Sequence, residues 1–136
     1  LEPVLAQRTV ISEMKRIGTA ADMIAYNRKE NRLVVVELKC GFDCGRSAPA
    51  MKDGKPCKME GPLHGASDCN VNRHLAQLAV TRELFVREKA TMDRIGELGL
   101  EREVAGVLMY ANDEGVETHD LDEWWKKRAV GVLGTL

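Results

Sequence analysis

The run over residues 33–39, Leu-Val-Val-Val-Glu-Leu-Lys, constrains the fold of this chain more than any other segment. β-Branched and aliphatic residues favour a strand. Side chains alternate between the two faces of a strand, so Glu37 and Lys39 face one way while Val36 and Leu38 face the other. A carboxylate and an ammonium at the end of an apolar strand are costly to bury unless they bind something. The run therefore predicts a buried strand that ends in a functional pair.

Three strands in tandem are expected in the first third of the chain. Alternating apolar residues predict strands over 9–17 and 19–26, with a turn or bulge at Gly18, and the polar segment 27–32 suits a hairpin loop before strand 33–39. Short connections between successive strands make an antiparallel meander. After it, the pattern predicts a helix over 73–90 capped by Asn70 or Asn72, a short helix or turn over 91–102, strands over 103–110 and 116–119, and a last helix capped by Asp120 or Asp122. The expected class is α/β, a mixed central sheet flanked by helices.

The composition suits one globular domain and limits the partners. A length of 136 residues fits a single domain, and an apolar share of 44% is too high for a disordered chain. The net charge of −1 gives no general attraction to nucleic acid, although a local basic patch would suffice. Since no apolar run reaches the roughly 20 residues of a membrane span and no secretory signal is visible, we expect an intracellular protein with no membrane partner. Because the chain starts at Leu1, further domains or chains upstream are expected.

The predicted hairpin brings a second carboxylate close to Glu37. Asp22 lies on the neighbouring strand, at a position close to Glu37 or Lys39. Two carboxylates can hold Mg²⁺ or Mn²⁺ through oxygen, and such an ion activates water and neutralises charge on a phosphate. Lys39 would orient the water or stabilise the transition state. The alternative is a surface aspartate beside a cross-strand Glu–Lys pair worth a few tenths of a kcal/mol.

These residues resemble the PD-(D/E)xK nuclease superfamily. Gly18 lies four residues before Asp22, and fifteen positions later comes Val-Val-Val-Glu37-Leu-Lys39. The glycine makes the motif similar to the branch that holds the RecB nuclease domain, the Cas4 proteins and lambda exonuclease, in which the following helix carries a glutamine, here Gln77. The resemblance implies a restriction-endonuclease-like core and a metal-dependent nuclease that hydrolyses DNA in replication, recombination or repair, or in a virus or mobile element. Exonuclease action is favoured over endonuclease action.

The resemblance also implies a role for each residue. Asp22 and Glu37 would bind Mg²⁺ or Mn²⁺, Lys39 would activate the attacking water, and Gln77 would position Lys39 or the substrate strand. Glu13 is similar to an acidic position in viral and phage relatives and would be a further metal ligand, although a plain carboxylate on the strand surface is the favoured alternative. The His or Glu that many members carry on an earlier helix is missing here unless Glu2 serves, so that ligand is absent or lies upstream. His74, on the same helix face as Gln77, is expected to be solvated or to cap the helix, and a place at the same site as Gln77 is the alternative.

Residues 40–71 are rich in Gly, Pro, Ser, Asp and Lys and predict a long loop. Four cysteines fall in or beside it, together with His64, at Cys40, Cys44, Cys57 and Cys69. Their spacing lacks the tight knuckles of structural zinc sites, so free thiols are favoured over bound zinc and a disulfide comes last. The loop lysines and a helix arginine would contact a DNA backbone, at Lys52, Lys55, Lys58 and Arg73, although a solvated loop is the alternative. A zinc-stabilised binding module and an inactive nucleic-acid-binding nuclease fold are the rival functions.

Overall fold

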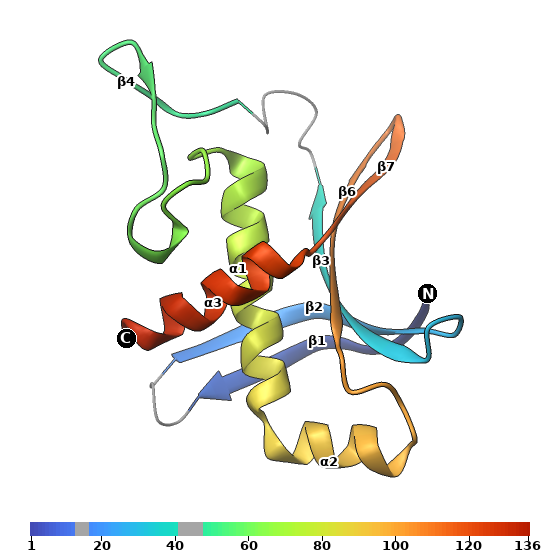
Figure 1. Cartoon of the computed structure of the whole chain (residues 1–136). Coiled ribbons are helices and arrows are strands. Elements are labelled where there is room, and N and C mark those ends of the chain that lie inside the picture. The colour runs from blue at the N-terminus through green and yellow to red at the C-terminus, as the bar shows by residue number, and fades with distance from the viewer. Residues whose placement is uncertain (13–16, 41–47) are drawn as a thin grey trace.

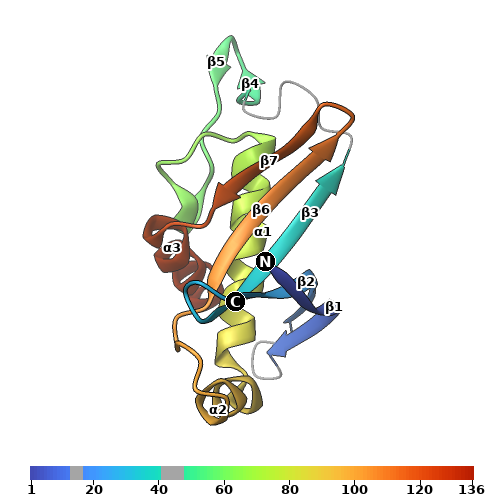
Figure 2. The ribbon, with the colours of Figure 1, turned by 90° about the vertical axis from the view of Figure 1, so that its right-hand side faces the viewer.

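The computed structural model describes residues 1–12, 17–40 and 48–136. Its centre is a mixed five-stranded sheet with the strand order β1-β2-β3-β6-β7, and the helices pack against one face of that sheet (Figures 1 and 2). The sheet strands are β1 (Glu2–Ser12), β2 (Ile17–Asn27), β3 (Arg32–Cys40), β6 (Ala105–Asn112) and β7 (Gly115–Asp120). The helices are α1 (Asn70–Arg87), α2 (Lys89–Glu97) and α3 (Glu123–Gly134). The predicted α/β class is confirmed.

Strands β1, β2 and β3 form the predicted antiparallel meander. The predicted turn or bulge at Gly18 is wrong, because Gly18 lies inside β2 and pairs with Ile11 of β1 in a register that does not shift there. A single glycine is a turn signal in a sequence, but a strand tolerates it where the ladder on both sides continues. Strand β1 also begins well before the predicted residue 9.

Strand β3 pairs in parallel with β6, on the side of β3 away from β2. A strand buried on both faces reads as a continuous apolar run, which explains the three consecutive valines. Val35 faces the helices in the main core, where it joins Leu78 of α1 and Leu108 of β6. Val34 and Val36 face the other way and form a smaller cluster with Ala25.

The helix starts differ in part from the prediction. Asp122 caps α3 as expected, because its carboxylate accepts the backbone N–H of Trp125 at 3.2 Å. Neither Asn70 nor Asn72 caps α1: the cap position is Cys69, and the Asn72 amide donates to the carbonyl of Ser67 instead. Asparagine side chains readily hydrogen-bond to nearby backbone groups, and Asn72 makes such a bond to the loop before the helix. The helix itself begins at Asn70.

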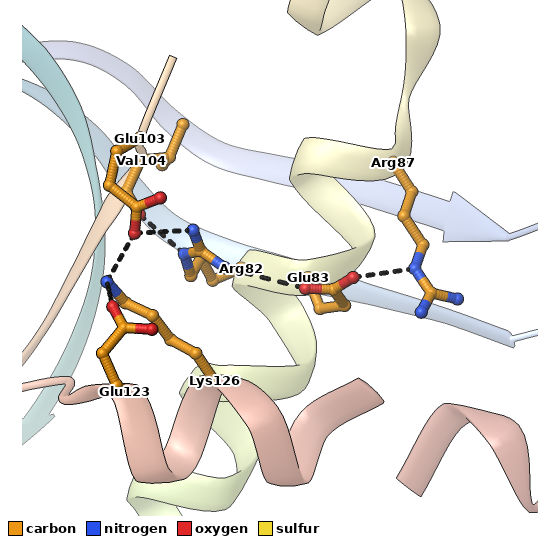
Figure 3. Close-up of polar contacts among 7 residues, drawn as sticks. All are labelled: Arg82, Glu83, Arg87, Glu103, Val104, Glu123 and Lys126. Carbon is orange, nitrogen blue, oxygen red and sulfur yellow. Dashed lines mark hydrogen bonds and ion pairs between the residues drawn. The ribbon is translucent and has the colours of Figure 1, made fainter. Parts of the chain in front are cut away.

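A polar cluster ties α1 to α3 and to the start of β6 (Figure 3). Arg82 of α1 is buried, and its Nε donates to the carbonyl of Val104 at 2.6 Å. Its Nη2 donates to Glu103, which also accepts from Lys126 of α3 at 2.6 Å. These charged groups are paired, as buried charges must be, and they hold α1 over the sheet.

The predicted loop contains a small hairpin of β4 (Met51–Lys52) and β5 (Lys55–Pro56), followed by the 3-10 turn η1 (Gly61–Leu63). Asp53 and Gly54 have φ angles of 53° and 74°, which suit a tight two-residue hairpin turn. The hairpin projects from the end of the molecule where β3 ends (Figures 1 and 2). Among the helices of the described ranges, none has the length and apolar character that a membrane crossing requires.

Candidate active site

Asp22 lies where β2 separates from β3. The ladder between the two strands runs from Asn27 opposite Arg32 to Met23 opposite Val36. Beyond that pair β3 continues beside β6 to Cys40, whereas β2 turns away and crosses behind α1 in the view of Figure 1. At this point the side chain of Asp22 replaces the backbone of β2 as the hydrogen-bond partner of β3: its Oδ2 accepts the backbone N–H of Leu38 at 2.8 Å. The predicted placement of Asp22 beside the Glu-x-Lys segment is thus observed.

Glu37 is the buried acid of the site, with 3% of its surface exposed. Its side chain lies on the helix-covered face because it alternates with Val36 along β3. Burial raises the pKa of the Glu37 carboxyl, and the negative charge of Asp22 raises it further, whereas Lys39 opposes both. One oxygen, Oε1, lies 3.2 Å from the Lys39 ammonium. The other, Oε2, is buried and accepts no hydrogen bond from an N–H or O–H donor of the described residues, while a hydrogen bond shared with the Asp22 carboxyl also contributes to the raised pKa.

Lys39 connects the sheet to α1. Its side chain is 21% exposed, and its ammonium lies between Glu37 and the side-chain carbonyl of Gln77, to which it donates at 3.4 Å. Gln77 comes from the second turn of α1. The structure therefore brings together four of the predicted residues, Asp22, Glu37, Lys39 and Gln77.

His74 and Tyr110 are two neighbours of this group whose roles sequence reasoning missed. Tyr110 of β6 is the parallel partner of Lys39, and its hydroxyl lies 2.8 Å from Nδ1 of His74. Burial lowers the pKa of His74, and the charge of Lys39 lowers it further. The expected solvated or capping role of His74 is wrong, because its ring faces the sheet. The three-residue spacing of His74 and Gln77 already indicated that they share a helix face. The position of Tyr110 depends on the pairing of β3 with β6, which are far apart in the sequence.

The other predicted residues are not gathered at this point. Glu13 and Cys44 lie outside the described residues. Arg73, near the start of α1, is exposed and forms an ion pair with Asp68 at 2.6 Å, which raises the pKa of Arg73. The loop lysines are exposed on or next to the projecting hairpin, at Lys52, Lys55 and Lys58.

Three of the cysteines are free thiols with different surroundings: Cys40 is exposed, Cys57 is half-buried and Cys69 is buried. Within residues 1–12, 17–40 and 48–136, no three His, Cys, Asp or Glu side chains gather closely enough to hold a metal ion. Because Cys44 and Glu13 are not among these residues, zinc at the cysteines and a third carboxylate beside Asp22 both stay predictions.

Comparison with known proteins adds little to this geometry. No family model matches the sequence. No curated protein matches it either. Among solved structures the chain is similar to one titled "Crystal structure of SSO0001", with 18% sequence identity and a TM-score of 0.36. That alignment covers 99% of this chain and 50% of the other, so the chain spans about half of that protein's length. A likeness of this size transfers neither a fold nor an activity.

The donor set suits a hard divalent cation. Asp22 and Glu37 contribute carboxylate oxygens, which Mg²⁺ and Mn²⁺ prefer to nitrogen or sulfur. A buried carboxylate oxygen that lacks a partner costs free energy, and a cation would remove that cost. The two acids, with the lysine beside them, are the residues that could hold such an ion next to a phosphate.

Proposed function

We propose that this chain is a Mg²⁺- or Mn²⁺-dependent nuclease domain that hydrolyses phosphodiester bonds of DNA. The observation that carries the proposal is a pair of neighbouring carboxylates: Glu37 is buried, and the charge of Asp22 beside it adds to the rise of its pKa. Perturbed carboxylates of this kind gather at functional sites, and a cation bound by both would relieve their repulsion. Exonuclease action is the favoured form of the activity, and an intracellular location goes with it.

Each residue has a separate task in this proposal. Asp22 and Glu37 would hold the ion, which supplies positive charge at the scissile phosphate and makes water acidic. Lys39 would donate a hydrogen bond to the attacking water or to a phosphate oxygen, because its ammonium is already at the site and partly exposed. Gln77 would hold the Lys39 ammonium from the helix side.

The projecting hairpin would supply the contact with the DNA backbone. Lys52 and Lys55 face each other across the two short strands, and Lys58 follows in the same segment. The hairpin lies at the end of the molecule to which β3 leads (Figure 2). Although the chain has a net charge of −1, this local cluster would attract phosphates and direct a strand toward the carboxylates. Exposed Arg73 would extend the contact along α1.

A cleavage assay tests the proposal. Linear DNA, single- and double-stranded and labelled at either end, is incubated with the protein and Mn²⁺, and a closed circular plasmid reports endonuclease action. We expect metal-dependent loss of the linear substrates and no loss with Asp22→Asn, Glu37→Gln or Lys39→Met. Glu30→Gln, an exposed carboxylate in the β2–β3 loop, is the matched control and should cleave normally. Intact DNA with folded wild-type protein, or full activity in any of the three site variants, would refute the assignment.

A further inference from the structure

Tyr110 and His74 connect β6 to α1 directly beside Lys39. Tyr110 and Lys39 are register partners on neighbouring parallel strands, so both side chains project from the same face of the sheet. Tyr110 is 2% exposed, and its hydroxyl lies 2.8 Å from Nδ1 of His74. Either tautomer of a neutral imidazole supports this hydrogen bond, as donor or as acceptor.

Gln77 lies three residues after His74 on the same face of α1. A bond that holds His74 over β6 therefore also sets how far Gln77 lies from β3. The contact between Gln77 and Lys39 is 3.4 Å, longer than the usual hydrogen-bond range, so a small shift of the helix would break it. On the sheet side, Tyr110 packs edge-to-face against His119 at 5.7 Å between ring centroids.

We propose that His74 and Tyr110 are positioning residues for Lys39, acting through Gln77. The inference rests on the proposed nuclease function, because it assigns them to the same site. Neither residue needs to touch DNA. The hydrogen bond between the Tyr110 hydroxyl and the His74 imidazole keeps α1 at the distance from the sheet at which Gln77 reaches the Lys39 ammonium. The alternative is a contact that only stabilises helix packing.

A second polar contact between α1 and the sheet provides a matched control. The hydroxyl of Thr81, one turn after Gln77, lies 3.3 Å from the hydroxyl of Thr19 on β2. Because the Thr81 hydroxyl also donates to the backbone carbonyl of Gln77 at 2.9 Å, the control variant is made at Thr19. Both contacts join the same helix to the same sheet, but the Thr19 contact lies on the side away from β6. Thr19→Val removes a hydroxyl without changing shape, as Tyr110→Phe does. A purely structural role would make the two substitutions equivalent.

The experiment compares Tyr110→Phe, His74→Leu, His74→Asn and Thr19→Val with the wild type. We expect Tyr110→Phe and His74→Leu to lower kcat for DNA cleavage with Mn²⁺ by about tenfold to a hundredfold, with little change in KM, as for a catalytic group moved by a fraction of an ångström. His74→Asn, whose amide can replace Nδ1, should recover most of the rate. Thr19→Val should lower the Tm but keep kcat. Equal losses of kcat in Thr19→Val and Tyr110→Phe would overturn the inference.

A second readout separates this inference from the proposed function. The side-chain amide signals of Gln77 in ¹⁵N NMR report its contact with Lys39 without any cleavage. They should shift in Tyr110→Phe and His74→Leu and stay unchanged in Thr19→Val. Wild-type cleavage with normal kcat in the first two variants would overturn the positioning role and leave the nuclease assignment standing. A wild-type protein that cleaves no DNA would remove the nuclease assignment, and unshifted Gln77 signals would then remove the positioning role as well.

Discussion

The carboxylate of Asp22 accepts the backbone N–H of Leu38 at 2.8 Å, at the place where the β2–β3 ladder has ended. The bond holds the aspartate beside Glu37, because Leu38 is the next residue along β3. It also satisfies a backbone N–H for which β2 no longer offers a carbonyl. One side chain thus terminates the ladder and completes the acidic pair.

Two substitutions at Asp22 should separate these roles. Asp22→Asn keeps an oxygen that accepts from Leu38 but removes the charge, so the free energy of unfolding should change little while cleavage falls at least a hundredfold. Asp22→Ala removes both and should also destabilise the fold by about 1 kcal/mol. Urea unfolding and the cleavage assay measure the two effects. Asp93→Asn, an exposed aspartate on α2, is the control. Normal cleavage by Asp22→Asn would contradict the metal-ligand role.

Glu37 should destabilise the metal-free protein at neutral pH. Because burial raises the pKa of its carboxyl, the folded state holds the proton more tightly than the unfolded chain. The stability of the wild type therefore falls as the pH rises from about 4 through that raised pKa. Glu37→Gln cannot ionise and places a donor amide near Asp22. Its free energy of unfolding should exceed that of the wild type by about 1 kcal/mol at pH 7, and the difference should vanish at about pH 4.

Added Mn²⁺ should reverse this order. An ion that binds only the folded state raises the Tm in proportion to the logarithm of its concentration. We expect this rise in the wild type and not in Glu37→Gln, measured by calorimetry with Mg²⁺ or Mn²⁺ titrated into each protein. Equal rises in both proteins would place the cation elsewhere in the chain.

Local pattern was sufficient to predict the strand and its acids. The apolar run defined β3 to within one residue at each end, and the short polar loop made the β2–β3 hairpin, and hence the Asp22–Glu37 neighbourhood, predictable. The predictions that were wrong concern positions set by pairing between strands. A turn or bulge was predicted at Gly18, but hydrogen bonding to β1 continues through this residue and keeps it within β2. The position of Tyr110 beside Lys39 follows from a parallel register between strands on either side of the loop, α1 and α2, which no local pattern encodes.

The hairpin lysines should account for part of the DNA affinity. Replacing Lys52, Lys55 and Lys58 by alanine should weaken binding, and should reduce the slope of log K against log salt by about 0.9 for each lost phosphate contact. Fluorescence anisotropy with labelled duplex DNA, in buffer without divalent ions, measures both. The matched control removes the same charge from exposed lysines elsewhere, at Lys29, Lys89 and Lys127. An equal effect in both triple variants would show attraction by charge alone and no hairpin site.

Arg82 should be the most costly charged residue of the fold to replace. It is 7% exposed, and it donates both to the carbonyl of Val104 and to the carboxylate of Glu103 (Figure 3). Arg82→Met fills similar space but leaves that carbonyl without this donor. We expect a loss of about 2–4 kcal/mol in the free energy of unfolding, measured by urea denaturation. Arg87→Met, which removes an exposed ion pair with Glu83 on the same helix, should cost less than about 1 kcal/mol.

Glu103 should show a pH dependence opposite in sign to that of Glu37. The hydrogen bond from Lys126 lowers the pKa of the Glu103 carboxyl most, and the charge of Arg82 lowers it further. The carboxylate therefore stabilises the fold above its ordinary pKa, and this stabilisation is lost as the pH falls through the lowered value. Since the side chain is 48% exposed, solvent limits the contribution to at most about 1 kcal/mol.

The wild type should be more stable than Glu103→Gln at pH 7 and equal to it in strong acid. Glu37→Gln, in contrast, should have a larger free energy of unfolding than the wild type at pH 7. A stability difference between wild type and Glu103→Gln that persists unchanged into acid would show that the glutamate acts through packing and not through its charge.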